Sequence, residues 1–397
     1  MIALNRCMSV LYIVGMLKNA LFILPVLMLY YGYKGVSIGE FFLIQGFSSL
    51  VVFFTEVPTG YIADIFSRKK VAVLGFLVWS VGYLFWIFGY GFWPILIGEL
   101  IFGLSLSLLS GTFEAYMFDL LKKRGKEGLF HKKFAKYNVF SNIGLFVATI
   151  SGSVLYEKIG ADETVWLCFM CSFIAFVLML FMPEISEAQR VVSKDKSKIK
   201  DIIDIFIKTL KNKSVRDLML FSGIYGVMTL VLMWGLQAVM IERDVPVMLF
   251  GVILGINSLG RIIWSSISGK LYDKLRIIKI FRLMLIILFI AYLGAIFSLK
   301  VEYVFVYVCL ALMIIGCGSV ILSRISISTQ INHITKSDER ATVLSVESMA
   351  DTMCTSFGMM ALKPLFDTIG IGNTFVVTFV LIVPLFVLFY RFRKNDL

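Results

Sequence analysis

The feature that most constrains this chain is a series of apolar segments, each about 20 residues long, that recurs along its 397 residues. A membrane-spanning α-helix needs about 20 mainly apolar residues, whereas a strand of a membrane barrel needs about 10 residues that alternate in polarity. Hydrophobic residues make up 59% of the chain and charged residues only 16%, a balance outside the range of soluble globular domains. The sequence therefore predicts an all-α integral membrane protein.

The spacing of the apolar segments predicts twelve transmembrane helices. Their expected ranges are Met8–Tyr31, Ile38–Ile62, Val71–Tyr90, Pro94–Leu121, Phe134–Tyr156, Thr164–Met182, Asp217–Ile241, Val247–Ser268, Ile277–Phe297, Val304–Arg324, Arg340–Lys363 and Thr374–Tyr390. A polar, lysine-rich stretch separates the sixth segment from the seventh. We therefore expect a six-helix bundle over 1–183, a cytoplasmic linker over 184–216 and a second six-helix bundle over 217–397.

The linker combines apolar residues at helical spacing with charged residues between them. Ile199, Ile203 and Phe206 recur on one side, opposite Lys200 and Lys208. This pattern is typical of a helix that lies on the membrane surface. The alternative is a solvated linker.

The distribution of basic residues predicts the orientation in the membrane. The net charge of +12 could suggest nucleic acid as a partner, but the basic residues alternate between short loops and form no basic face, so we expect none. If the N-terminus is cytoplasmic, the outer loops hold only Lys34, Lys158, Arg243 and Lys300. The inner side then holds the linker lysines and Arg68, Lys69, Lys70, Lys122, Lys123, Arg124, Lys126, Lys132, Lys133, Lys136, Lys270, Lys274, Arg276, Lys336, Arg340 and Arg391. The positive-inside rule therefore places both termini in the cytoplasm.

A short charged stretch, residues 56 to 70, separates the second predicted helix from the third. Gly60 is expected at a tight turn where backbones approach closely, because glycine has no Cβ. Asp64 can face basic partners or helix N-termini, and Arg68 and Lys69 hold the stretch on the cytoplasmic side. We therefore interpret it as a gating loop that begins at Glu56.

The loop between the eighth and ninth predicted helices carries a degenerate copy of this stretch. Gly269 and Asp273 keep the four-residue spacing, and Arg276 follows them. Equivalent loops at equivalent positions are what a duplicated six-helix unit predicts.

The first of these stretches resembles the loop signature of the major facilitator superfamily, Gly-x-x-x-Asp-(Arg/Lys)-x-Gly-Arg-(Arg/Lys). Four positions match, namely Gly60, Asp64, Arg68 and Lys69, whereas Ile65 and Ser67 depart from it. The resemblance implies two pseudo-symmetric six-helix bundles that rock about a site near the membrane midplane.

Ionisable residues inside predicted spans are functional candidates, because charge is expensive in a bilayer. The candidates for a substrate cavity or for proton coupling are Lys18, Asn19, Asn257, Arg261, Glu347 and Asp351. Glu347 and Asp351 share one helix face through their i,i+4 spacing, and Lys18 is the expected partner of Asp351. The alternative is that these residues only pair helices with one another.

A second group lies near the expected inner ends of helices. Glu114, Asp119 and Arg324 are candidates for an inner gate, together with Glu56. Simple solvation at the membrane surface is the alternative. Enzymatic function is not expected, and neither is a cofactor or a metal.

The resemblance extends to bacterial members of the superfamily, many of which are thought to export drugs or amphipathic metabolites. It rests on the run from Glu56 to Asp64 together with Phe113-Glu114-Ala115 and Arg340-Ala341-Thr342. It implies a monomeric transporter in the bacterial inner membrane that exports a small amphipathic organic molecule by alternating access, driven by protons. The alternatives are an uptake symporter or facilitator and, from another class, a membrane receptor that does not transport.

Overall fold

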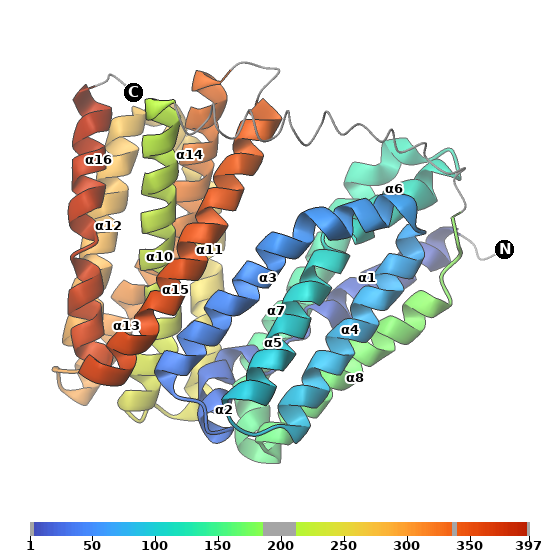
Figure 1. Ribbon diagram of the computed structural model, residues 1–397, viewed down its shortest axis with the longest axis horizontal. Helices are drawn as coiled ribbons and strands as arrows, with labels where there is room; N and C mark the ends of the chain where they lie inside the picture. The colour runs from blue at the N-terminus through green and yellow to red at the C-terminus, as the bar shows by residue number, and fades with distance from the viewer. Residues whose placement is uncertain (1–3, 186–211, 336–339, 395–397) are drawn as a thin grey trace. The chain divides into compact units, whose positions relative to one another are not determined.

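The computed structural model (Figure 1) describes residues 4–185, 212–335 and 340–394. Every regular element in these ranges is helical, which confirms the predicted all-α fold. Ten described segments are long and apolar enough to cross a membrane. The last of them, Val343–Phe392, contains two spans, because the chain turns at Gly370 with a φ of 75°. The interrupted helix at the N-terminus supplies another span, so the total is the predicted twelve.

The helices pack into two compact units. Unit 1 comprises residues 1–37, 47–193 and 246–254, and unit 2 comprises residues 38–46, 194–245 and 255–397. The surface helix predicted in the linker falls mainly within 186–211, which lies outside the described residues. Each unit is described below by itself.

Eight helices begin in the N-terminal half of the chain. They are α1 (Leu4–Lys18), α2 (Leu27–Tyr33), α3 (Ile38–Ile65), α4 (Arg68–Phe88), α5 (Phe92–Leu109), α6 (Thr112–Lys122), α7 (Phe130–Ile159) and α8 (Ala161–Leu180). Within unit 1, α4 contacts α5, α6 and α8, while α1 packs against α7 and α8.

Seven helices follow in the C-terminal half. They are α10 (Lys213–Glu242), α11 (Val247–Lys274), α12 (Ile277–Phe297), α13 (Tyr303–Gly318), α14 (Val320–Ile334), α15 (Arg340–Phe379) and α16 (Ile382–Lys394). Within unit 2, α10 contacts α12, α13, α14, α15 and α16, so it forms the centre of that unit.

The two halves repeat one plan of helix lengths. Helices α3 and α11 each have 28 residues, and α4 and α12, which follow them, each have 21. The next span is divided in both halves, into α5 and α6 and into α13 and α14. This correspondence supports a duplicated six-helix unit.

The first span is not the continuous helix predicted from its hydropathy. Helix α1 ends at Lys18, and a short 3-10 turn at Leu24–Val26 precedes α2. An α-helix continuing through Pro25 would lose the hydrogen bond to the carbonyl of Leu21 and would clash with it. Pro25 instead occupies the start of the 3-10 turn, where a missing N–H costs little.

The interrupted span packs closely against α7 at two glycines. A Cβ on Gly144 would lie 2.3 Å from the carbonyl oxygen of Met16, and one on Gly152 would lie 1.9 Å from that of Phe22. Both distances are far below van der Waals contact. These glycines therefore let α7 approach the backbone on either side of the interruption.

The expected tight turn at Gly60 is not formed. Helix α3 continues to Ile65, so only Phe66 and Ser67 connect it to α4. Apart from chain neighbours and the backbone of the same helix, no atom of the described residues lies within 4 Å of the position that a Cβ on Gly60 would occupy, and the same holds for Gly269 in α11. The turn expected at Gly60 is therefore wrong, because the helix extends past it, whereas the gating role of Gly60 stays a prediction.

We expect Gly152→Ala to destabilise the protein. The added methyl group would meet a backbone carbonyl, which cannot move aside as a flexible side chain can. Overpacking of this kind costs about 1–3 kcal/mol, more than the gain of up to about 1 kcal/mol in helix propensity. The thermal unfolding midpoint of the full-length protein in detergent should therefore fall.

Gly32→Ala in α2 is the matched control, because a Cβ there would meet no atom within 4 Å. Its midpoint should stay at or above that of the wild type. Equal midpoints for Gly152→Ala and the wild type would show that α7 does not approach Phe22 as closely as described.

Candidate functional site

An ion pair in unit 2 joins a residue predicted for the inner gate to one predicted for the substrate cavity or proton coupling. Arg324 on α14 lies 3.7 Å from Asp351 on α15, measured from Nη2 to Oδ2. The side chain of Arg324 is 63% exposed and that of Asp351 only 17%. The candidate gate residue thus faces the candidate coupling residue.

Arg324 lies deeper along its span than predicted. The span was expected to end at Arg324, but α14 continues for ten more residues to Ile334. At 1.5 Å per residue, the guanidinium therefore belongs about 15 Å before the end of the helix. The predicted helix end at Arg324 is therefore wrong, because the following run with serine and threonine residues still forms helix, and the role of Arg324 in an inner gate stays a prediction.

A second carboxyl group lies one turn from Asp351. Glu347 accepts a hydrogen bond of 2.9 Å from the hydroxyl of Ser222 on α10. Asp351 also lies against α10, where a Cβ on residue 226 would come within 2.9 Å of its Oδ1. Gly226 therefore makes room for this carboxyl group. The i,i+4 pair predicted from the sequence faces α10 and α14.

Arg261 belongs to the same region of unit 2. It lies near the middle of α11, next to Gly260, whose backbone carbon would lie 3.3 Å from a Cβ on Gly318, six residues before Arg324. Its side chain is exposed, and none of the described residues forms a hydrogen bond or an ion pair with it. Asn257 lies one turn earlier on the same face, and its Oδ1 is buried without a hydrogen-bond partner in the described part of the chain.

The opposite face of α11 is apolar. Exposed large side chains on it are Val252, Ile256, Leu259 and Ile263. Helical geometry of 3.6 residues per turn places them about half a turn away from Arg261. The apolar face suits lipid, and the face with Arg261 and Asn257 points away from it.

The remaining cavity candidates, Lys18 and Asn19, lie in unit 1. Lys18 is the last residue of α1, and Asn19 begins the interruption that follows. Lys18 is half-buried, and it makes no hydrogen bond or ion pair with another described residue. Discontinuous helices at this depth commonly line substrate sites in transporters. Pairing of Lys18 with Asp351, which belongs to unit 2, stays a prediction.

Two basic residues of the predicted gating loop, residues 56 to 70, form hydrogen bonds with neighbouring helices of unit 1. Arg68 donates to Asp119 at 2.6 Å and to the carbonyl oxygen of Ala115 at 3.1 Å, both on α6. Lys69 donates to the carbonyl oxygen of Leu180 at the end of α8. The structure thus joins two predicted groups, the loop motif and the inner gate.

The other gate and loop candidates lie at helix ends or on the surface. Glu56 and Glu114 are exposed, and Asp64 lies in the last turn of α3, with its side chain outside the described part of the chain. In the second copy, Asp273 is exposed near the end of α11, and Arg276 precedes the first residue of α12. Their roles in gating stay predictions.

The burial of Lys34 was not predicted from the sequence. It forms a 2.8 Å ion pair with Asp162 and donates to the carbonyl oxygen of Ile87 at 2.8 Å. The rings of Tyr30 and Tyr33 flank its amine, each with its centroid at 5.6 Å. The aromatic residues just before Lys34 were the signal that could have revealed this site.

Glu99 on α5 is a second buried group whose partner the sequence did not reveal. It accepts a hydrogen bond from the hydroxyl of Tyr31 and is only 7% exposed. Together with the ion pair of Lys34, it fastens α2 to neighbouring helices of unit 1. Both sites therefore connect helices of unit 1 to one another.

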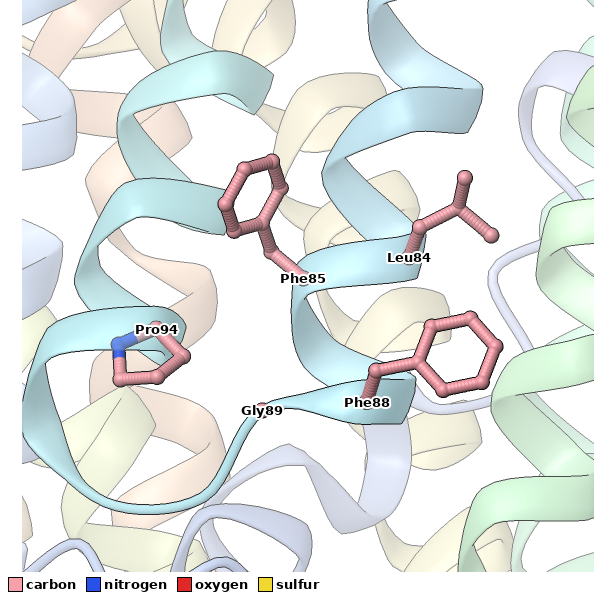
Figure 2. Close-up of a pocket in the computed structure, with 5 residues that line it drawn as sticks. All are labelled: Leu84, Phe85, Phe88, Gly89 and Pro94. Atoms are coloured by element: carbon pink, nitrogen blue, oxygen red, sulfur yellow. The ribbon is translucent and has the colours of Figure 1, made fainter.

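An apolar recess lies at the turn between α4 and α5 (Figure 2). It has a volume of about 380 Å³ and is lined by Leu84, Phe85, Phe88, Gly89 and Pro94. No polar side chain lines it, so it lacks the groups that orient a polar solute in a binding pocket. The recess is therefore not a candidate for the substrate site.

Metal binding gains no support from the described residues. Among them, no group of three histidine, cysteine, aspartate or glutamate side chains is arranged to hold a metal ion. The six cysteines are free, and four of them are buried.

Comparisons with known proteins agree with this architecture. The sequence model of the Major Facilitator Superfamily matches residues 7–358. An uncharacterized MFS-type transporter of Methanocaldococcus jannaschii is 24% identical over 369 residues, which cover 89% of this chain and 89% of that protein.

Solved structures show the same fold. The nucleoside transporter NupG has a TM-score of 0.81 at 17% identity, and the match covers 98% of each chain. A POT family transporter in complex with a thioalcohol-conjugated peptide has a TM-score of 0.72 at 15% identity, over 98% of this chain and 96% of that one. At such identities the likeness extends to the fold alone.

We expect a double-mutant cycle to detect strong coupling between Arg68 and Asp119. Both side chains are largely shielded, with exposures of 16% and 10%, so each single change to alanine leaves the other charge poorly solvated. The coupling free energy should lie within about 1–3 kcal/mol. It can be measured from unfolding of the four variants in mixed detergent micelles.

The pair of Lys70 and Glu184 provides the control. Its atoms lie 3.5 Å apart and its side chains are 70% and 48% exposed, so its coupling should stay below about 1 kcal/mol. Similar coupling for the two pairs would contradict the assignment of Arg68 and Asp119 as the fastening of this loop.

Proposed function

Because the chain belongs to the major facilitator superfamily, we propose that it is a proton-coupled secondary transporter that moves a small amphipathic organic molecule by alternating access. The observation that carries the proton coupling is the position of Asp351 beside Arg324 and one turn from Glu347. A carboxylate inside a membrane span is costly unless it is paired or protonated. A conformational change that makes and breaks this ion pair therefore alters the affinity of Asp351 for a proton.

Efflux in exchange for protons is the first candidate for the direction of transport. It is supported by the sequence features shared with exporters, namely the run from Glu56 to Asp64 and the short motifs that begin at Phe113 and Arg340. In this candidate a proton and the substrate bind alternately. Lys18 and Asn19 would line the route beside the interruption of α1.

Uptake by proton symport is the second candidate, and one observation favours it. Arg324 is largely exposed although it pairs with Asp351. A proton on Asp351 would free this guanidinium for a substrate, so the proton and the substrate would bind together.

Proton movement in proteoliposomes separates the two directions. The pH dye pyranine is trapped inside, and an inward gradient of each candidate compound is imposed, from amphipathic cations to nucleosides, peptides and organic acids. Symport would acidify the lumen, whereas antiport would make it more alkaline. Flux of a compound without any proton movement would refute proton coupling, and no flux of any compound would favour a receptor that does not transport.

The membrane orientation and oligomeric state belong to the same proposal. We place the chain in the inner membrane of a bacterium as a monomer, with both termini in the cytoplasm. The support is the distribution of basic residues, which leaves four in the predicted outer loops. Labelling of single cysteines introduced near Lys34 and near Lys270 by a membrane-impermeant reagent tests it, because only the first should react in intact cells.

We expect Asp351→Asn to abolish accumulation driven by a pH gradient. The amide cannot take up and release a proton, but it keeps the size of the side chain, so exchange and downhill flux should persist. Uptake into proteoliposomes with and without an imposed gradient measures both activities.

Asp367→Asn is the matched control, since Asp367 lies on the same helix and pairs with Lys363 at 2.7 Å. It should leave gradient-driven accumulation near the wild-type level. Full accumulation by Asp351→Asn would exclude Asp351 as the coupling site.

A further inference from the structure

We propose that Arg261 and Arg324 form a binding site for the anionic group of the substrate, a carboxylate or a phosphate. While no anion is bound, Arg324 pairs with Asp351 instead. This inference deepens the proposed function by naming the chemical class of the substrate. It depends on that function only for the role of Asp351 in proton coupling.

The hydrogen-bond donors of Arg324 are poorly satisfied by Asp351. A guanidinium has five N–H donors, and the shortest approach to Asp351 is 3.7 Å, beyond hydrogen-bonding distance. In unit 1 the pair of Arg68 and Asp119 is at 2.6 Å and shielded. Arg324 thus keeps most of its donors available for another acceptor.

Arg261 has no counter-ion among the described residues. No described residue pairs with it, although it lies near the middle of a membrane-length helix. Arginine stays charged in proteins, and an unpaired charge at such a position is costly. The like charge of Arg324 nearby adds to this cost, and a bound anion would relieve it for both guanidinium groups.

Asn257, one turn from Arg261 on the same face of α11, can add a further donor. Asn257 is only 6% exposed, and its side-chain oxygen has no hydrogen-bond partner among the described residues. Oxygen and nitrogen of an amide are assigned from their partners, so the unpartnered position of Asn257 can hold the N–H donor. Two guanidinium groups and one amide donor suit the oxygens of a planar carboxylate or of a tetrahedral phosphate.

Among the described residues, Asp351 is the acid that forms an ion pair with Arg324. Glu347 on the same helix instead accepts a hydrogen bond from the hydroxyl of Ser222 on α10. On α10, Asp217 is buried and pairs with Arg391 of α16. Helix α12 contributes only basic residues, Lys279 and Arg282, both in its first two turns. Asp351 is therefore the acid that competes with a substrate anion for Arg324.

This competition determines whether a proton and the substrate anion strengthen or weaken each other's binding. A proton on Asp351 removes its charge and releases Arg324, which can then bind the anion. Proton binding and anion binding favour each other, so the two move in the same direction. The site therefore supports the symport candidate.

Binding of small probes to the purified full-length protein tests the site without any transport assay. Benzoate and phenyl phosphate are the anionic probes, and benzyl alcohol and benzylamine are the neutral and cationic controls of similar shape. A ligand that binds the folded state raises its thermal unfolding midpoint. We expect both anions to raise it and both controls to leave it unchanged.

Substitutions assign the effect to the proposed residues. Arg261→Gln and Arg324→Gln should each weaken the apparent affinity for the anions by about tenfold or more, because each loses charge-assisted hydrogen bonds. Arg282→Gln on α12, an exposed arginine outside the site, should bind like the wild type. Equal affinities for all three variants would overturn the proposal.

Anion binding by Asp351→Asn distinguishes competition for Arg324 from a purely structural role of Asp351. Removal of the competing carboxylate should strengthen anion binding, whereas loss of a structural ion pair would weaken it. In the wild type, binding of benzoate should strengthen as the pH falls from about 8 to about 6, where its carboxylate stays ionised. In Asp351→Asn this dependence should disappear. Weaker binding by Asp351→Asn would refute the competition.

Lipid headgroups are the other source of a phosphate, and vesicles distinguish it. Nanodiscs of phosphatidylglycerol and of phosphatidylcholine are compared for the wild type and Arg261→Gln. If phosphatidylglycerol alone raises the midpoint in a manner that depends on Arg261, and neither benzoate nor phenyl phosphate binds, then the site takes a lipid and the substrate assignment is overturned.

The site and the proposed function can fail separately. Anion binding that depends on Arg261, without flux of any compound, would retain the site and refute the transporter. Proton-coupled flux of a cation or a neutral compound that is unchanged in Arg261→Gln would retain the transporter and refute the anion site.

Discussion

The structure depends on one constraint, that charged and polar groups shielded from water need partners within the protein. Unit 1 meets it with short, shielded contacts. Lys34 pairs with Asp162 at 2.8 Å, Arg68 pairs with Asp119 at 2.6 Å, and Glu99 accepts from Tyr31. Each contact joins different helices, so the groups that would be costly alone fasten the bundle.

The cavity candidates differ from these contacts. The ion pair of Arg324 and Asp351 is long and half open, and Lys18 and Arg261 have no partner among the described residues. A short, shielded pair costs more to break than a long, open one, so the loose pair can more readily exchange its partner for a substrate or a proton. This contrast, more than depth along the helix, separates the groups proposed to act from those that hold the fold.

The interrupted helices meet the same constraint for the backbone. Where α13 gives way to α14, Ser319 bonds to the hydroxyl of Tyr225 at 2.5 Å and donates to the carbonyl oxygen of Gly316. Where α1 ends, α7 closes on the backbone through Gly144 and Gly152. Irregular backbone is thus covered by protein, and it lies beside Lys18 in one unit and within a few residues of Arg324 in the other. Breaks and functional candidates coincide because both require shelter from lipid.

The sequence by itself determined the membrane class, twelve spans, the superfamily and the set of ionisable residues inside the spans. These properties are local, since hydropathy over about 20 residues decides whether a segment can cross a bilayer. Tertiary structure decided which of those residues meet. Arg324 and Asp351 sit on different helices, and the motif residue Arg68 binds Asp119 on α6, contacts that no hydropathy pattern encodes.

The sequence also misplaced the turn at Gly60, because a motif specifies residue types, whereas the length of α3 determines where its backbone lies. Pro25 could have revealed the break in the first span, but the close approach of α7 that shelters this break depends on packing between helices.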